Sequence, residues 1–350
     1  MIVDAHLDMA YTALAYKRDL TKTVAQLRDE EAGRKVGDGL ITATFPSLLD
    51  GGVGLIFGTM FVAPYSKQRE GQELVYRQPA EAHRHAMRQL DYYHRLADSL
   101  DYLRLVGDQE SLAEVVSSHQ EGETPLLGIV PLMEGADPIA GPEALEEWVE
   151  RGLRIVGLAW DDTRYAGGAW QNTQLGITPA GYALLEAMTD YNLILDITHM
   201  SEKASLEALE RYEGRVVATH SNPRQLIPMN RHLSDTQIHR LAERKGVMGV
   251  VLYNRFLKPG LTMSDPKESV TLDVVVAHID YVCQLLGTAE NVGIGSDFDG
   301  GFGAQHIPAE IDSVHDLHKI GSALREKGYA PADVRGIMGG NWLRLLEETW

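Results

Sequence analysis

The sequence predicts a (β/α)8 barrel with a dinuclear metal site at the carboxyl ends of its strands. Three observations predict it: eight short apolar segments rich in β-branched residues recur along the chain, helical patterns separate them, and ionisable residues follow several of them directly. A barrel of alternating strands and helices can use a chain of 350 residues as one unit. We therefore expect a single domain over residues 1–350.

The predicted strands are apolar nearly throughout, as in residues 193–197 and 247–252, instead of alternating between apolar and polar. Such runs are typical of parallel strands that are buried on both faces by covering helices. The predicted strands lie near residues 1–6, 53–62, 126–134, 153–160, 193–199, 215–220, 247–253 and 292–297.

Helical patterns lie between and after these strands. Helix start signals support several of them, because Thr178, Ser201 and Ser234 each directly precede a predicted first turn. The C-terminal stretch 341–350 also reads as an amphipathic helix. The predicted helices are 79–103, 108–118, 142–151, 179–190, 202–211, 235–244, 270–286 and 312–327.

Composition excludes several classes of protein. The formal charge of −18 argues against nucleic acid or an anionic membrane as the main partner. The single cysteine, Cys283, excludes an intrachain disulfide and a thiolate zinc cluster. The start lacks a signal-peptide pattern, and no apolar run approaches the roughly 20 residues that span a bilayer. We expect no membrane contact and a cytoplasmic location.

Potential metal ligands follow four of the predicted strands. His6 and Asp8 come at the end of the first strand, Glu134 ends the third, His199 the fifth and His220 the sixth. A barrel brings the carboxyl ends of its strands together on one face, where active sites lie. Imidazole and carboxylate groups are ligands for zinc. The sequence therefore predicts a metal site on this face.

Two further polar residues end the last strands. Tyr253 follows the seventh strand and Asp297 the eighth. Asp299 competes for the role of the strand-eight acid, but Asp297 directly follows the apolar strand and is preferred. Six possible ligands are better explained by two metals roughly 3.5–4 Å apart that share a carboxylate and a hydroxide. Glu134 is the natural bridge.

With these residues the chain resembles the membrane (renal-type) dipeptidases, peptidase family M19. The matching segments appear in the family's order and span nearly the whole chain. They are 4–8 (DAHLD), 133–137 (MEGAD), 196–201 (DITHMS), 219–222 (THSN), 230–235 (NRHLSD) and 295–300 (GSDFDG).

The resemblance implies roles for individual residues. One Zn²⁺ would be held by His6, Asp8 and Glu134, and a second by Glu134, His199 and His220. The substrate's free carboxylate would bind Arg231, its other contacts would include Tyr253, and the catalytic water would contact Asp297. Family activity is hydrolysis of dipeptides, often with a D-residue tolerated at the C-terminal position, and in some members opening of β-lactam rings. The resemblance also implies that the protein can form a homodimer.

One position departs from the family pattern. Trp160 stands where renal-type enzymes carry a histidine that contacts the substrate. Indole donates one hydrogen bond but cannot accept a proton or carry charge. The neighbouring Asp161 and Asp162 can attract a substrate amine or a basic side chain, or they can simply face solvent as loop acids. This departure bears on substrate preference.

The reaction expected from these residues is attack of a metal-bridging hydroxide on a peptide carbonyl. Glu134 would hold both metals, and Asp297 would orient the nucleophile and pass its proton to the departing amine. The planar fork of Arg231 suits a carboxylate and disfavours neutral esters.

The sequence leaves two other functions open. One is another amidohydrolase-like two-metal hydrolase, such as a deacylase, a lactonase, a β-lactam hydrolase or a phosphotriester hydrolase. The other is a barrel that binds ligands without catalysis. A non-catalytic barrel would be marked by degenerate metal ligands, and all five expected ligands are present.

Overall fold

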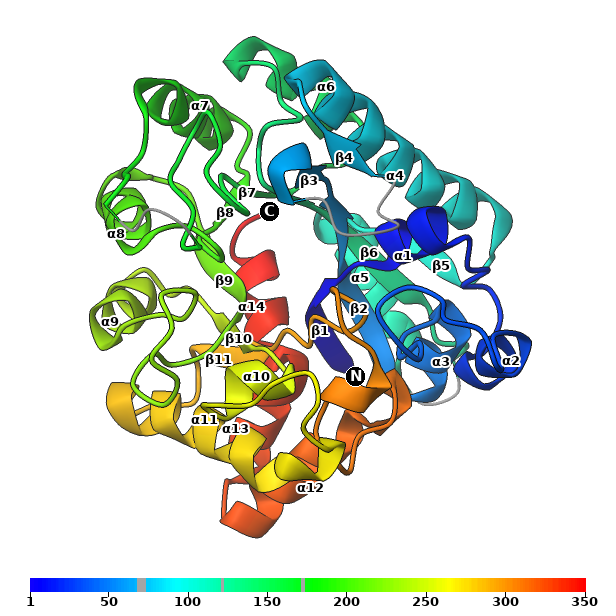
Figure 1. Cartoon of the computed structure of the whole chain (residues 1–350). Helices are drawn as coiled ribbons and strands as arrows, with labels where there is room; N and C mark the ends of the chain where they lie inside the picture. The colour runs from blue at the N-terminus through cyan, green and yellow to red at the C-terminus, as the bar shows by residue number, and fades with distance from the viewer. Residues whose placement is uncertain (68–73, 121–122, 171–173) are drawn as a thin grey trace.

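Eight parallel strands close into a barrel in the computed structural model, which describes residues 1–67, 74–120, 123–170 and 174–350 (Figure 1). Neighbouring strands follow the order β2-β1-β11-β10-β9-β8-β7-β6, and pairing between β2 and β6 closes the ring. This confirms the predicted (β/α)8 architecture. The barrel strands are β1 (Ile2–Leu7), β2 (Val53–Phe61), β6 (Leu127–Glu134), β7 (Ile155–Gly157), β8 (Ile194–Asp196), β9 (Val216–Ser221), β10 (Met248–Val250) and β11 (Val292–Ile294).

Helices surround the barrel, as Figure 1 shows. The predicted start signals are confirmed, because the hydroxyls of Thr178, Ser201 and Ser234 each accept a hydrogen bond from a backbone N–H in the first turn. The helices are α1 (Met9–Tyr16), α2 (Val24–Glu30), α3 (Phe45–Asp50), α4 (Pro79–Ser99), α5 (Gln109–Ser118), α6 (Leu145–Glu150), α7 (Pro179–Asp190), α8 (Glu202–Arg211), α9 (Asp235–Glu243), α10 (Asn254–Leu257), α11 (Leu272–Leu286), α12 (His318–Lys327), α13 (Pro331–Arg335) and α14 (Asn341–Glu347).

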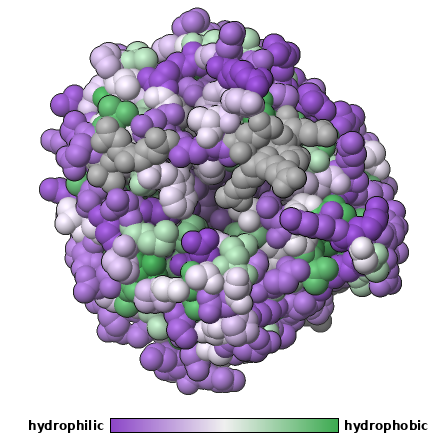
Figure 2. Space-filling view, viewed as in Figure 1, coloured by the Kyte–Doolittle hydropathy of each residue, from purple (hydrophilic) through white to green (hydrophobic). Residues whose placement is uncertain are grey.

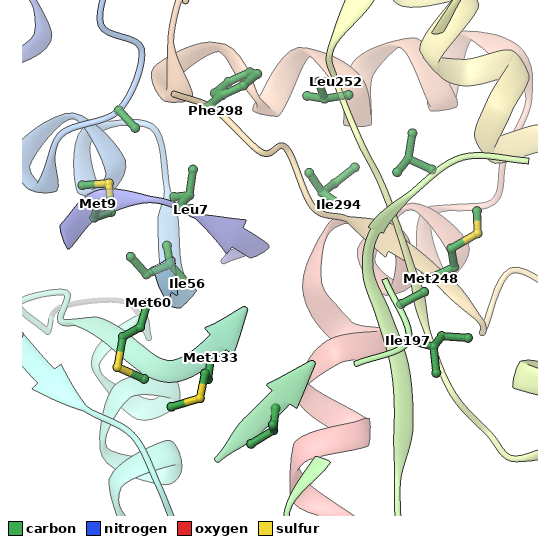
Figure 3. Close-up of a cluster of buried hydrophobic side chains, with 14 of the residues drawn as sticks. Leu7, Met9, Ile56, Met60, Met133, Ile197, Met248, Leu252, Ile294 and Phe298 are labelled. Atoms are coloured by element: carbon green, nitrogen blue, oxygen red, sulfur yellow. The ribbon is translucent and has the colours of Figure 1, made fainter. Parts of the chain in front are cut away.

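Two apolar layers hold the barrel together. One face of each strand packs against the helices, and Figure 3 shows part of this layer, where Leu7, Ile56 and Met133 come from three neighbouring strands. The alternate residues, such as Val130 and Leu132 of β6, form a separate cluster that includes Trp342 of α14. The Trp342 indole donates a hydrogen bond to the Ile294 carbonyl at 3.1 Å, which fixes α14 against β11.

Several predicted boundaries are corrected by the structure. The predicted helix 79–103 ends at Ser99, and residues Leu103–Leu105 form a further strand, β5, which pairs with β6. The first crossover contains α1, α2 and α3, none of which was predicted. A small two-stranded sheet pairs β3 (Ala63–Pro64) with β4 (Val75–Tyr76).

Helix α11 is part of one stretch, residues 267–286, that is long and apolar enough to cross a membrane by length and composition alone. In the folded chain this helix lies on the outside of the ring of strands, and it buries Val275, Ile279 and Val282 in the apolar layer between strands and helices. Its apolar character therefore has an explanation in packing.

Two strands carry a bulge near their carboxyl ends. In β1, Asp4 and Leu7 are paired with Ile56 and Gly58 of β2, so three steps on β1 face two on β2. In β9, the register shifts in the same way opposite Met248 and Val250 of β10. A bulge inserts one residue and changes the direction in which the following side chains point.

Candidate active site

The carboxyl ends of the strands bring four of the predicted ligands together. The Glu134 carboxylate is at the centre, with its Oε1 atom 3.0 Å from His199 Nε2, 3.5 Å from His220 Nε2 and 3.7 Å from His6 Nε2. All four side chains are almost fully buried. Residues from β1, β6, β9 and the segment after β8 thus meet around one oxygen atom.

Two further carboxylates lie near the same nitrogen atom of His6. Its Nε2 atom is 3.9 Å from Asp8 Oδ2 and 3.9 Å from Asp297 Oδ1. The buried Asp8 Oδ1 atom has no hydrogen-bond partner among the described residues. Five of the six side chains form two overlapping groups with metal-ligand spacing, His6–Glu134–His220 and His6–Asp8–Asp297. The sixth, His199, joins the cluster through its contacts with Glu134 and His220.

Local backbone geometry aims these side chains. Glu134 continues the alternation of Val130 and Leu132, so its carboxylate follows their inward-facing side chains. His6 and His220 both lie within the bulged parts of their strands. His199 and Asp297 adopt left-handed backbone conformations, with φ of 67° and 60°. Such conformations are uncommon for residues other than glycine and cluster at functional sites.

A chain of hydrogen bonds favours the His220 tautomer that carries its proton on Nδ1. Thr219 Oγ1 donates to Asp196 Oδ2 at 2.5 Å, so its oxygen is free to accept from His220 Nδ1 at 3.0 Å. With the proton on Nδ1, the lone pair of Nε2 faces Glu134 and His199. Such outer partners orient metal-binding histidines.

Burial sets the charge state of the cluster. It lowers the pKa of His6, His199 and His220 well below the usual range, so the imidazoles are neutral and can act as ligands. Burial, together with the neighbouring carboxylate of Asp8, raises the pKa of Glu134 well above its usual range. Burial, and then the charge of Asp299, raises the pKa of Asp8 to about 7.

This donor set fits divalent cations. The Nε2 atoms of His199 and His220 lie 3.1 Å apart. The protonated nitrogen of His220, Nδ1, faces Thr219 and not His199. Neutral imidazoles and crowded carboxylates have lone pairs directed at one another, and the nearby guanidinium of Arg231 donates to the His220 carbonyl. Cations among them would satisfy the orphaned Asp8 oxygen and relieve the repulsion.

The cluster opens into a cavity of about 400 Å³, and Figure 2 shows this face of the molecule hollowed near its centre. Asp8, Glu134, His199 and Asp297 line it beside the predicted substrate contacts Trp160 and Tyr253. Asp297 therefore faces the cavity as predicted. The competing acid, Asp299, also lines the cavity, but its carboxylate accepts hydrogen bonds from the backbone N–H groups of Thr42 and Ala43.

Arg231 lies deeper than the sequence suggested. Its side chain is 2% exposed, is absent from the cavity lining, and donates from Nη2 to the His220 carbonyl at 2.7 Å. Among the described residues, its Nε and Nη1 atoms have no hydrogen-bond partner. Burial lowers the pKa of Arg231 to about 10, and the nearby Asp297 and Glu134 carboxylates oppose this shift.

The two acids after Trp160 have other partners. Asp161 is 4% exposed and lies 3.3 Å from Lys67 Nζ, and it is Lys67 that lines the cavity. Asp162 accepts a hydrogen bond from the Gly168 N–H at 2.8 Å. Asp161 is therefore buried and paired, whereas Asp162 is an exposed loop acid, as the second alternative expected. The substrate-binding role of Asp161 stays a prediction. In the structure its carboxylate forms an ion pair with Lys67.

Sequence reasoning gave no role to two buried acids that support the site. Asp196 receives the Thr219 hydroxyl, and Asp4 accepts hydrogen bonds from both the backbone N–H and the hydroxyl of Ser296. Both acids lie inside segments that carried the family resemblance. Their signal was an aspartate within an otherwise apolar strand.

The chain was compared with known proteins. The family model described as "Membrane dipeptidase (Peptidase family M19)" matches residues 1–349. "Dipeptidase aclJ" of Aspergillus oryzae is 28% identical over 99% of this chain and 78% of its own length. An uncharacterized protein in the pqqA 5' region of Klebsiella pneumoniae is 32% identical over 65% of this chain and 84% of its own length.

Solved structures show the same likeness. A metallo peptidase from Rhodobacter sphaeroides, crystallised with a phosphinate mimic of the dipeptide L-Ala-D-Ala, superimposes with a TM-score of 0.80 at 25% identity. The alignment covers 100% of this chain and 99% of that one. Together with the metal-ligand geometry, these matches show that the chain belongs to peptidase family M19, the membrane dipeptidase family, and is a metallo-dipeptidase that hydrolyses peptide bonds.

Proposed function

We propose that this protein is a two-zinc dipeptidase that accepts dipeptides with a D-residue at the C-terminal position. The observation that carries the proposal is the position of Glu134 Oε1, within 3.7 Å of three imidazole Nε2 atoms. One carboxylate in contact with so many neutral nitrogen ligands is suited to bridging two cations.

Two ligand sets follow from this arrangement. His6, Asp8 and Glu134 would hold one zinc ion, and Glu134, His199 and His220 the other. Nitrogen and oxygen ligands without a thiolate are typical of catalytic zinc sites that keep a position open. When bound, the two ions acidify a water molecule and polarise the scissile carbonyl.

Asp297 is proposed to move the proton. Its carboxylate lines the cavity and lies 3.9 Å from His6 Nε2, beside the ligand cluster. It would accept a proton from the attacking water as the new C–O bond forms, and deliver it to the amine as the C–N bond breaks. Burial and the Asp8 carboxylate raise the pKa of Asp297 well above its usual range, which favours proton acceptance.

Arg231 is proposed to recognise the free carboxylate of the substrate. Its Nε and Nη1 donors lack partners among the residues described, and the charges of Asp297 and Glu134 act on its guanidinium. A buried guanidinium with spare donors strongly favours an incoming carboxylate. Because the arginine lies deep, a dipeptide would have to place its carboxylate toward the barrel interior, which excludes longer chains.

The substrate class is supported by the family and by one structural neighbour. The Rhodobacter sphaeroides enzyme was crystallised with a mimic of L-Ala-D-Ala. The family match also favours a dipeptidase over the lactonase, deacylase and non-catalytic alternatives.

The test is to measure hydrolysis of matched L,L and L,D dipeptides, together with metal content, before and after chelation and zinc addition. We expect two zinc ions per chain, loss of activity on chelation, recovery with zinc, and cleavage of L,D substrates. Full activity of metal-free protein would overturn the metal mechanism. A tripeptide cleaved as fast as its dipeptide would overturn the role of Arg231.

A further inference from the structure

The cavity next to the ligand cluster is unusually aromatic. Eight of its 21 lining residues are phenylalanine, tryptophan or tyrosine, whereas these types make up 7% of the chain. Neither proton transfer nor carboxylate binding, as proposed above, uses any of these rings; Trp160 and Tyr253 are expected substrate contacts. The enrichment therefore calls for a separate physical reason.

One wall of the cavity consists of three rings in contact. Phe61 lies between Tyr11 and Trp160, with ring centroids 5.4 and 5.0 Å away. Tyr11 and Phe61 are nearly buried and belong to a small apolar cluster against which Trp160 packs. Because its neighbours hold it, Trp160 presents a fixed apolar surface to the cavity.

A second wall consists of four rings. Phe256 lies 4.9 Å from Tyr253 and 6.2 Å from Trp170, and Tyr253 stacks on Phe302 at 4.4 Å with an interplanar angle of 14°. Trp170 is 40% exposed, so this wall reaches from the buried cluster to the surface. Rings in such contacts bind further aromatic groups by burial and by edge or stacking geometry.

The ligand cluster lies where the two walls meet. The ring centroid of His199 lies 6.0 Å from that of Trp160 in the first wall and 6.0 Å from that of Trp170 in the second wall. A scissile carbonyl held at His199 and Glu134 would therefore have one amino-acid residue near each wall. We propose that the preferred substrates are dipeptides with large apolar side chains, aromatic ones above all, on both residues. This inference rests on the proposed dipeptidase function.

Charge at the rim argues against a cationic substrate side chain. Aromatic rings also attract cations, but Lys67 and Arg255 both line this cavity. Arg255 is exposed, with Nη1 3.5 Å from Tyr253 Oη on the second wall. Two acids outside the ligand cluster line the cavity, and both have partners: Asp38 accepts a hydrogen bond from Tyr16 at 2.6 Å, and Asp299 accepts from the backbone N–H groups of Thr42 and Ala43. A basic side chain would meet the like charge of Arg255 at the rim, and that of Lys67, which is itself paired with Asp161.

The experiment is a panel of dipeptides assayed with the zinc-loaded protein. It compares kcat/KM for Phe-Phe, Leu-Leu, Ala-Ala, Lys-Ala and Asp-Ala in matched stereochemistry. Burial of one aromatic side chain against the walls should raise kcat/KM on the order of tenfold or more, and two should raise it further. Highest kcat/KM for Ala-Ala, Lys-Ala or Asp-Ala would overturn the inference while leaving the dipeptidase function intact. Cleavage of none by zinc-loaded protein would instead overturn the dipeptidase function.

Trp160→Ala tests the first wall directly. We expect the ratio of kcat/KM for Phe-Phe to that for Ala-Ala to fall at least about fivefold, because one wall loses its ring. Tyr191→Ala is the matched control, since Tyr191 is 37% exposed at the end of α7, outside the cavity lining, and should leave the ratio unchanged. A merely structural role of Trp160 would lower both rates equally, which would overturn its assignment to substrate specificity.

Discussion

Replacing Asp297 with Asn should abolish turnover and at the same time stabilise the metal-free protein. The carboxylate is 8% exposed, and its ligand oxygen lies within 4.8 Å of one of Asp8. At an effective dielectric constant of about 20, two charges at that distance repel by about 3 kcal/mol. The amide has nearly the same shape and removes this repulsion, whereas it cannot take the proton of an attacking water.

The pKa of Asp297 sets how the stability gained in Asp297→Asn should change with pH. Burial and Asp8 raise the pKa of Asp297 in the folded state, while Arg231 opposes them. The folded protein therefore binds more protons than the unfolded one above the ordinary pKa, and wild-type stability falls as pH rises. In Asp297→Asn this loss is absent, so the difference in Tm should grow from pH 5 to pH 8. For a chain of 350 residues, about 3 kcal/mol corresponds to a Tm increase of about 4 °C.

The assay combines calorimetry of chelated protein with turnover and metal analysis of zinc-loaded protein. We expect a higher Tm without metal, a loss of kcat of about 10²–10⁴-fold, and an unchanged zinc content. Asp98→Asn, at an exposed position on α4, is the matched control and should change none of these. A lower Tm for metal-free Asp297→Asn would refute the repulsion, and turnover within threefold of wild type would refute the proton-transfer role.

Three other substitutions test separate parts of the structure. Arg231→Ala should raise KM for dipeptides at least tenfold with a smaller effect on kcat, since a buried carboxylate partner is lost; steady-state kinetics would contradict this if KM were unchanged. Lys245 has a φ of 56° directly after α9, so Lys245→Gly should stabilise the fold by about 1 kcal/mol in urea unfolding, whereas Lys245→Ala should not. Burial lowers the pKa of His278 to about 4, so its neutral form is favoured in the fold and stability is lost as pH falls below 6.5. His278→Gln should therefore lose about 2 kcal/mol less than wild type between pH 7 and pH 5, and equal losses in urea titrations would contradict this.

The barrel strands could be predicted because burial on both faces leaves a strong apolar signal, as in β6 and β10. The first crossover could not be predicted from apolar periodicity. Its helices α1 to α3 are six to eight residues long, and their packing against the rest of the chain is not visible in local sequence. Strand β5 was missed because three residues after a long helix carry too little pattern.

The ligand cluster was visible because each ligand ends an apolar run. The depth at which side chains are buried, and their partners, could not be predicted. The sequence gives no sign that Arg231 is buried behind His220, or that Asp161 pairs with Lys67. Those relations depend on which loops cross the barrel mouth, and therefore on tertiary structure. The aromatic walls are also assembled from distant segments, so only the folded chain shows that Phe61 and Trp160 are neighbours.

The bulges in β1 and β9 imply that this active site tolerates changes of residue type better than changes of chain length. Removing a single amino acid between Asp4 and Leu7, or between Ala218 and Ser221, would restore regular pairing with the adjacent strand. The imidazole beyond the deletion would then turn toward the helices, and an apolar neighbour would occupy its place. In a library of variants, in-frame codon deletions at these two points should therefore inactivate the enzyme while leaving most of the barrel folded.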